Sequence, residues 1–157
     1  MKVKLQNSEL FAVIDDEDYE LIKNYKWYYR QGYAVRYRST HEPQGPFQIA
    51  MHRVILNTPK NLITDHIDGD RLNNLKSNLR ICTDLQNAKN VKRHKDNKSG
   101  AKGVCKRNDG RKKCWNAMIM VNGVKIRLGD FYSLEEAVKA YDAAAIKYHG
   151  EFAKTNY

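Results

Sequence analysis

The segment TDHIDGDRLNNLKSNLRICTDLQNAKN, residues 64–90, combines residue types that can take part in acid–base and metal chemistry. It contains an Asp-His pair, Asp65 and His66, followed by a series of asparagines that includes Asn78 and Asn87. It has no Cys-x-x-Cys pair and no second histidine, so its composition does not indicate a closed zinc site. A polar surface loop is the alternative interpretation, and the choice depends on whether the fold brings these side chains together.

Two short strands are expected on either side of a loop in this segment. Residues 61–67 and 78–82 have strand-like composition, and an Asp-Gly dipeptide starts the loop between them. Neighbouring residues of a strand face opposite ways. Asp65 and His66 can therefore serve one site only if the strand is irregular at that point.

A helix is expected directly after the second strand. Thr83 and Gln86 fit a capping box, so the helix should start near Asp84. Asn87 then lies on its first or second turn. If this helix packs across the strand pair, Asn87 can approach the Asp-His pair.

The spacing of these residues resembles the HNH motif of the endonucleases encoded by phages and mobile introns. His66 stands as the first signature residue, Asn78, twelve positions later, as the second, and Asn87, twenty-one positions later, as the last. The resemblance implies a ββα-metal fold over about residues 61–95 with one divalent ion. It implies Asp65 and Asn87 as metal ligands, His66 as the general base, and Asn78 as the residue that fixes the loop orienting His66.

The implied reaction explains each residue type. Cleavage of a phosphodiester needs an activated water, and a histidine with a pKa near neutrality can take its proton. The leaving oxygen and the added negative charge need stabilisation, which a hard cation provides. Asp and Asn oxygens suit Mg²⁺ better than zinc, so Mg²⁺ is the expected ion, and Mn²⁺ can substitute.

The first sixty residues are expected to be rich in strands. Strands are predicted within LFAVI, KWYYR, GYAVRYR and FQIAMHRVIL, and one short helix within DDEDYELIKNYK. Five acids between Asp15 and Glu20 fit the first turn of that helix, with a metal site as the alternative. His52-Arg53 lies where the HNH family often has His-Arg, and the resemblance leaves a role near the scissile phosphate and a structural role equally open.

Basic charge is concentrated toward the C-terminal half of the chain. The formal net charge is +10, and residues 89–113 hold 11 basic side chains against two acidic ones. Clustered Lys and Arg favour a phosphate backbone through counterion release, with a solvated charged linker as the alternative. The sequence also lacks a signal core and a membrane-spanning apolar run, so a cytoplasmic protein of a bacterial or phage-infected cell is expected.

Residues 102–157 are predicted to form three strands followed by one helix. The strands lie in KGVCKR, CWNAMIMV and VKIRLG, and Asn122-Gly123 indicates a tight hairpin between the last two. A helix is expected from a cap at Ser133 to Gly150. Alternation places an apolar face toward this helix and leaves a basic face uncovered, which suits the major groove of DNA.

This region resembles the plant ethylene-response-factor (apetala-type) DNA-binding domain, which is also found fused to HNH nucleases. The matched motifs are GV (103–104), W-x-A-x-I (115–119), LG-x-F (128–131), EEA (135–137), AYDAAA (140–145), HGEFA (149–153) and Asn156. The resemblance implies DNA contacts by Lys102, Arg107, Lys125 and Arg127. Met118 and Met120 stand where plant members have polar or charged groups, so the plant target sequence does not transfer.

The sequence therefore predicts an α+β protein with a nuclease domain at 1–95, a linker at 96–101 and a DNA-binding domain at 102–157. Its predicted function is metal-dependent cleavage of double-stranded DNA, as in the homing endonucleases of phages and mobile elements. The rival interpretation is a non-catalytic DNA-binding regulator that uses the HNH fold as a scaffold. No membrane or protein partner is implied, and RNA binding has little support because no aromatic signature marks the outward strands.

Overall fold

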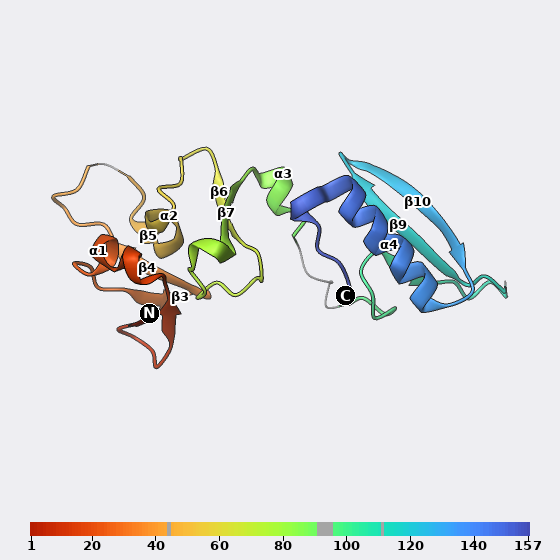
Figure 1. Cartoon of the computed structure of the whole chain (residues 1–157), viewed down its shortest axis with the longest axis horizontal. Helices are drawn as coiled ribbons and strands as arrows, with labels where there is room; N and C mark the ends of the chain where they lie inside the picture. The colour runs from red at the N-terminus through yellow and green to blue at the C-terminus, as the bar shows by residue number, and fades with distance from the viewer. Residues whose placement is uncertain (44, 91–95, 111) are drawn as a thin grey trace. The chain divides into compact units, whose positions relative to one another are not determined.

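The computed structural model describes residues 1–43, 45–90, 96–110 and 112–157, which form two compact units, Met1–Asp84 and Leu85–Tyr157 (Figure 1). Several small antiparallel sheets and a few helices make up the fold, which confirms the predicted α+β class. The segment 96–101 lies inside the second unit. Among the described helices, none is long and apolar enough to cross a membrane.

The first unit consists of short strands and helical turns around one apolar core. Its strands are β1 (Lys2–Lys4), β2 (Phe11–Val13), β3 (Tyr28–Arg30), β4 (Tyr33–Tyr37), β5 (Gln48–Ala50), β6 (Ile63–His66) and β7 (Leu79–Cys82). Its helices are α1 (Tyr19–Ile22) and α2 (Met51–Ile55), with 3-10 turns at Asp16–Asp18 and Lys76–Asn78. Sheets β1-β2, β3-β4-β5 and β6-β7 surround buried residues that include Leu5, Ile14, Trp27 and Met51.

The strand predicted within residues 47–56 occupies only the first half of that range. The strand β5 ends at Ala50, and α2 begins at Met51. Met51 and Ile55, four residues apart, both enter the apolar core, which is the spacing of one helix face. Packing of this face outweighs the strand preference of the β-branched residues nearby. His52 and Arg53 are consequently helical.

The second unit is a three-stranded antiparallel sheet with one long helix. The strands are β8 (Val104–Lys106), β9 (Trp115–Val121) and β10 (Val124–Phe131), in the order β10-β9-β8. Helix α4 (Leu134–His149) begins after Ser133, whose Oγ accepts a hydrogen bond from the Glu136 amide at 3.1 Å, and a 3-10 turn, Gly150–Phe152, follows it. These strands and this helix confirm the predicted pattern. The short helix α3 (Asp84–Asn87) crosses the division between the units.

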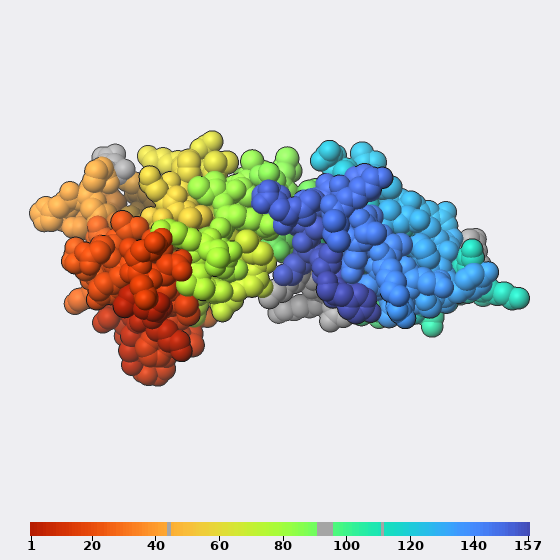
Figure 2. Space-filling view, in the orientation of Figure 1, coloured from red at the N-terminus to blue at the C-terminus, as the bar shows by residue number. Residues whose placement is uncertain are grey.

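Helix α4 covers one face of this sheet (Figure 1). The enclosed core combines small helix residues with apolar strand residues, among them Val104, Ala117, Ile119, Ala137, Tyr141 and Ala145. In the space-filling view, β10 and α4 form much of the visible surface of this unit (Figure 2). Gly103 has a φ of +72°, and a Cβ there would lie 2.0 Å from Cε2 of Tyr141. Only glycine allows the helix to approach the start of β8 this closely.

A β-bulge interrupts the pairing of β9 with β10. Arg127 pairs with Met118 and Gly129 pairs with Ala117, so Leu128 is an extra residue in β10. Beyond the bulge the alternation is shifted by one residue. Asp130, which pairs with Asn116, therefore lies on the same uncovered face as Arg127, whereas an unbroken strand would place residues three apart on opposite faces.

Candidate active site and nucleic-acid face

The β6-β7 pair positions the Asp-His dipeptide. Asp65 is opposite Arg80, and His66 is opposite Leu79, with no register shift. The irregular strand that would turn Asp65 and His66 to one face is therefore not seen in the pairing. Instead, Asp65 Oδ2 accepts hydrogen bonds from Arg80 Nε at 3.0 Å and Nη2 at 2.7 Å, and both side chains are largely buried.

His66 is held by an asparagine from the loop that follows it. Its side chain is buried, and Nε2 lies 3.2 Å from Oδ1 of Asn74. The amide nitrogen of Asn74 donates to the Leu72 carbonyl at 3.1 Å, which fixes Oδ1 toward the histidine. An amide oxygen only accepts hydrogen bonds, so Nε2 carries a proton and Nδ1 is the nitrogen that can take one in the neutral ring. Burial lowers the pKa of His66, and the bond to Asn74 acts in the opposite direction.

Two further aromatic rings pack around the histidine. His52 from α2 lies edge-on to His66 with ring centres 5.0 Å apart, and Tyr33 from β4 contacts both rings at 5.3 and 6.1 Å. The guanidinium of Arg71 lies 4.6 Å from the centre of the Tyr33 ring and donates to the Gln31 carbonyl. Burial, reinforced by the neighbouring His66 and by Arg53, lowers the pKa of His52 to about 3. His52 is therefore neutral at physiological pH.

The contacts of Arg53 lie on the chain that leads into β6. Its guanidinium donates to the carbonyls of Leu62 at 2.9 Å, Thr58 at 3.2 Å and Pro59 at 2.8 Å. These three bonds hold the turn before β6 against α2. A phosphate role for His52 or Arg53 stays a prediction.

Asn78 joins the two ends of the loop after His66. Its Nδ2 donates to Asp68 Oδ1 at 2.9 Å and to the Asn73 carbonyl at 2.8 Å, and its Oδ1 accepts from the Asp68 amide at 3.1 Å. Burial would raise the pKa of Asp68, but hydrogen bonds from Asn73, the Asp70 amide and Asn78 hold it below its usual value. This network gives the loop that carries Asn74 a defined shape.

Asn87 lies at the end of α3, in the second unit. The approach of Asn87 to Asp65 stays a prediction. Within the described residues, no group of three or more His, Cys, Asp or Glu side chains is arranged to hold a metal ion. Amides, water and substrate oxygens are further ligands that Mg²⁺ commonly takes.

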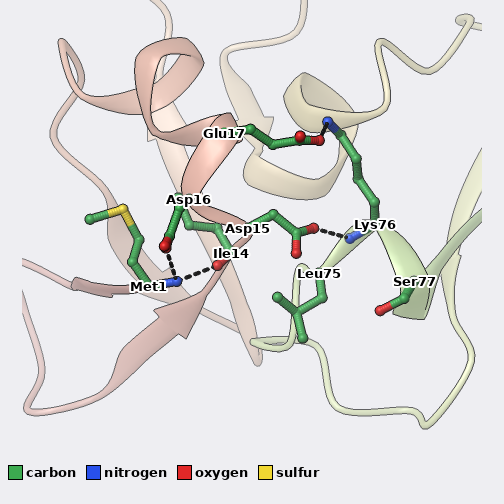
Figure 3. Close-up of a pocket in the computed structure, with 8 residues that line it drawn as sticks. All are labelled: Met1, Ile14, Asp15, Asp16, Glu17, Leu75, Lys76 and Ser77. Carbon is green, nitrogen blue, oxygen red and sulfur yellow. Dashed lines mark hydrogen bonds and ion pairs between the residues drawn. The ribbon is translucent and has the colours of Figure 1, made fainter.

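The acids at residues 15–18 bind cationic groups and a backbone amide of the first unit. Figure 3 shows Asp15, Asp16 and Glu17 at a pocket of about 580 Å³, where Asp15 accepts a hydrogen bond from the Lys76 amide at 2.7 Å. Lys76 Nζ pairs with Glu17 at 2.5 Å and with buried Asp18 at 2.8 Å, and the terminal amine pairs with Asp16. These contacts tie the N-terminal segment to the turn before β7. They favour the interpretation as a helix start over a metal site.

The four predicted DNA contacts of the second unit differ in their surroundings. Lys102 Nζ donates to the carbonyls of Lys89 at 3.1 Å and Lys154 at 3.5 Å, and burial lowers its pKa. Lys125 is exposed and lines a pocket of about 370 Å³ on the uncovered face of the sheet. Arg107 and Arg127 both pair with the carboxylate of Asp130.

Comparison with known proteins identifies the family. Residues 57–89 match the model of a family described as HNH endonuclease. A protein of Acanthamoeba polyphaga mimivirus described as an uncharacterized HNH endonuclease is 31% identical over 153 residues, covering 93% of this chain and 74% of the viral protein. The chain belongs to the HNH endonuclease family, which confirms that part of the sequence analysis.

Two further relatives match over shorter stretches. Protein 3.8 of Escherichia phage T7 is 31% identical over 96 residues, covering 61% of this chain and 77% of the phage protein. An ethylene-responsive transcription factor of Arabidopsis thaliana is 36% identical over 103 residues, covering 62% of this chain and 61% of the plant protein. No solved structure matches the chain significantly.

Proposed function

We propose that this HNH endonuclease hydrolyses phosphodiester bonds of double-stranded DNA with the help of a divalent metal ion. The observation that carries the proposal is the setting of His66, buried within the family-matched region and bonded through Nε2 to Asn74. A histidine held in one tautomer presents one defined nitrogen to a water molecule. This is the requirement for a general base.

His66 takes a proton from the attacking water at Nδ1. Asn74 keeps the proton on Nε2 and stabilises the imidazolium that forms, since its oxygen accepts a hydrogen bond from Nε2–H in both the neutral and the charged ring. Asn78 acts indirectly, because its hydrogen bonds to Asp68 and Asn73 maintain the conformation of the loop that carries Asn74. The rings of His52 and Tyr33 exclude water from one side of the base.

Asp65 and Asn87 are the proposed metal ligands. Because the regular pairing of β6 turns Asp65 and His66 to opposite faces, the proposal requires β6 to become irregular at this point when the ion and the substrate bind. The donor set fits a hard ion, since a carboxylate and an amide oxygen are ligands that Mg²⁺ accepts. A bound ion would stabilise the leaving 3′ oxygen and the charge added to the phosphate. Arg80 holds the carboxylate of Asp65 in place through Oδ2, which limits its motion before an ion binds.

The second unit is proposed to anchor the enzyme on DNA. Its uncovered face carries Lys125, Arg107 and Arg127, and the chain matches a plant ethylene-responsive transcription factor over 62% of its length. A DNA-binding domain joined to a nuclease domain is an arrangement that suits a homing endonuclease of a phage or mobile element, which must cut at a chosen site. Two relatives come from viruses, mimivirus and phage T7, and this viral origin is what supports the assignment.

The test is cleavage of supercoiled plasmid DNA with and without Mg²⁺. We expect nicked or linear product from the wild type only with the metal, and a loss of about 10²–10⁴-fold or more in His66→Ala. His41→Ala, which changes an exposed histidine of the same unit, serves as the matched control. Full activity of His66→Ala contradicts the assignment. DNA binding by the wild type without cleavage under any divalent ion favours the non-catalytic regulator.

A further inference from the structure

The uncovered face of the second unit contains a carboxylate at its centre. Asp130 is flanked by Arg107 and Arg127, and its side chain is 17% exposed. A negative charge on a surface that meets a polyanion weakens binding to every DNA sequence alike. Asp130 therefore does not contribute to DNA affinity, and its contacts with neighbouring side chains indicate a different role.

The Asp130 carboxylate joins three side chains of this face. Oδ2 accepts from Arg107 Nη1 at 3.2 Å and from Arg127 Nη2, while Oδ1 accepts from Asn116 Nδ2 at 2.7 Å. Asn116 is almost fully buried and also donates to the Gly129 carbonyl at 3.2 Å. The hydrogen bond from Asn116, with the two guanidinium groups, holds the pKa of Asp130 below its usual value. Asp130 is thus a fixed, charged acceptor.

The two arginines reach this acceptor from different parts of the sheet. Arg107 follows β8 at one edge, and Arg127 comes from β10 at the other edge. The bulge at Leu128 is the reason that Arg127 and Asp130 share a face. Each guanidinium has five N–H donors, and one donor of each is used by Asp130.

We propose that Asp130 is a positioning residue that orients Arg107 and Arg127 for contact with base edges of duplex DNA, and so determines sequence preference. This inference rests on the proposed DNA-anchoring role of the second unit. A guanidinium contacts guanine O6 and N7 through two donors in a fixed geometry, and each such pair discriminates strongly against a wrong base. An arginine that is not held this way can instead turn to a phosphate, which every sequence offers.

The experiment compares affinities for two duplexes in the full-length chain. A preferred duplex is first selected from a randomised library with the His66→Ala protein, which is expected to bind without cutting. Dissociation constants for this duplex and for a scrambled duplex are then measured by fluorescence anisotropy. Asp130→Asn retains an oxygen that can accept from Asn116 but removes the charge. We expect it to bind the scrambled duplex more tightly and to lose about tenfold or more of the preference for the selected duplex.

Glu135→Gln is the matched control, because it also removes one negative charge from the second unit. Glu135 lies in the first turn of α4 and pairs with Lys139 at 2.7 Å. This variant should strengthen binding to both duplexes by the same factor and leave their ratio unchanged. If Asp130→Asn behaves in the same way, the carboxylate acts only through its charge and the proposal is overturned.

Asp130→Glu separates position from charge and covers the case in which the asparagine variant does not fold. It keeps the net charge but moves the carboxylate by one methylene, so the preference should fall while the salt dependence of binding stays that of the wild type. An unchanged preference in a folded Asp130→Glu protein contradicts the proposal. A His66→Ala protein that enriches no sequence also overturns it, and the plasmid cleavage assay then still tests the nuclease by itself.

Discussion

At the catalytic centre, a single amide side chain decides which nitrogen of His66 can act as a base. Asn74 is fully buried, and its two hydrogen bonds run to His66 and to the Leu72 carbonyl. A free imidazole exchanges its proton between both nitrogens, and only one of them faces the substrate in any given pose. Fixing the tautomer therefore raises the fraction of enzyme that is ready to react.

Asn74→Leu should lower kcat while leaving most of the fold intact. Leucine has a similar volume but offers no acceptor to Nε2, and losses of about 10–100-fold are typical when a residue that orients a functional histidine is removed. Asn74→Asp restores an acceptor and should recover part of the activity. Single-turnover cleavage rates and a circular-dichroism melt separate the two effects. A leucine variant with the wild-type rate would show that His66 needs no such orientation.

The buried histidines predict how stability depends on pH. The pKa of His52 is about 3 in the folded chain and about 6.5 in an unfolded one. Between these values the unfolded chain binds a proton that the folded chain does not, so the free energy of unfolding falls as pH decreases. The slope from His52 alone reaches about 1.4 kcal/mol per pH unit. The lowered pKa of His66 acts with the same sign.

His52→Gln should therefore reduce the loss of stability between pH 6.5 and 4. The measurement is urea unfolding of the wild type and the variant at several pH values in that window. His41→Gln, at an exposed position, should keep the wild-type slope. If the free energy of unfolding has the same pH dependence in all three proteins, His52 is protonated to the same extent in the folded and the unfolded chain, and the prediction is wrong.

At the level of elements, the close approach of α4 to β8 depends on one residue without a side chain. The Tyr141 ring occupies the space that a Cβ at Gly103 would fill, and a backbone oxygen, that of Met118, lies 2.8 Å away. Any larger residue must displace both the helix and the sheet. This contact therefore sets the thickness of the core of the second unit.

Gly103→Ala should destabilise the second unit much more than Gly110→Ala. The two glycines have similar φ values, +72° and +77°, so both substitutions share the cost of a left-handed backbone, about 1 kcal/mol. At Gly110 no described atom lies within 4 Å of the added carbon, whereas at Gly103 the clash adds to that cost. Thermal melts of both variants measure the difference. Equal melting temperatures would show that the helix can shift without loss.

The sequence predicts elements that are defined by local signals. Asn122-Gly123 marked the β9-β10 hairpin, and Ser133 marked the start of α4; both are found. The bulge at Leu128 has no local signal that alternation could reveal, so the position of Asp130 on the uncovered face was missed. At the catalytic site, Asn74 is one of many asparagines in its loop, and Arg80 becomes a partner of Asp65 only through strand register.

At the level of the whole molecule, the two units have separate cores, and the division between the units falls within the short helix α3. The apolar core of the first unit is complete within Met1–Asp84, and that of the second unit lies beyond residue 100. The region matched to the HNH family, residues 57–89, extends past the division into the second unit. Folding units and the functional motif therefore do not have the same limits.

Truncation at two nearby positions tests this difference. Fragment 1–95 keeps the whole family-matched region and should cut DNA with Mg²⁺, but at DNA concentrations about 10²–10⁴-fold higher, because the second DNA-binding module is lost. Fragment 1–84 should fold but not cut, since it ends before Asn87. Plasmid cleavage over a range of DNA concentrations gives the comparison. Equal cleavage by both fragments would show that Asn87 is dispensable.

The short helix at the division also restricts how such a gene can exchange its parts. A recombination that joined a new DNA-binding domain after Asp84, at the boundary between the two units, would replace Asn87 and the end of the nuclease motif. A crossover a few codons later, beyond residue 89, would leave the nuclease motif whole and would still supply a new DNA-binding domain. Relatives that have exchanged their DNA-binding domain and kept nuclease activity are therefore expected to diverge in sequence only after α3. That point lies inside the second structural unit.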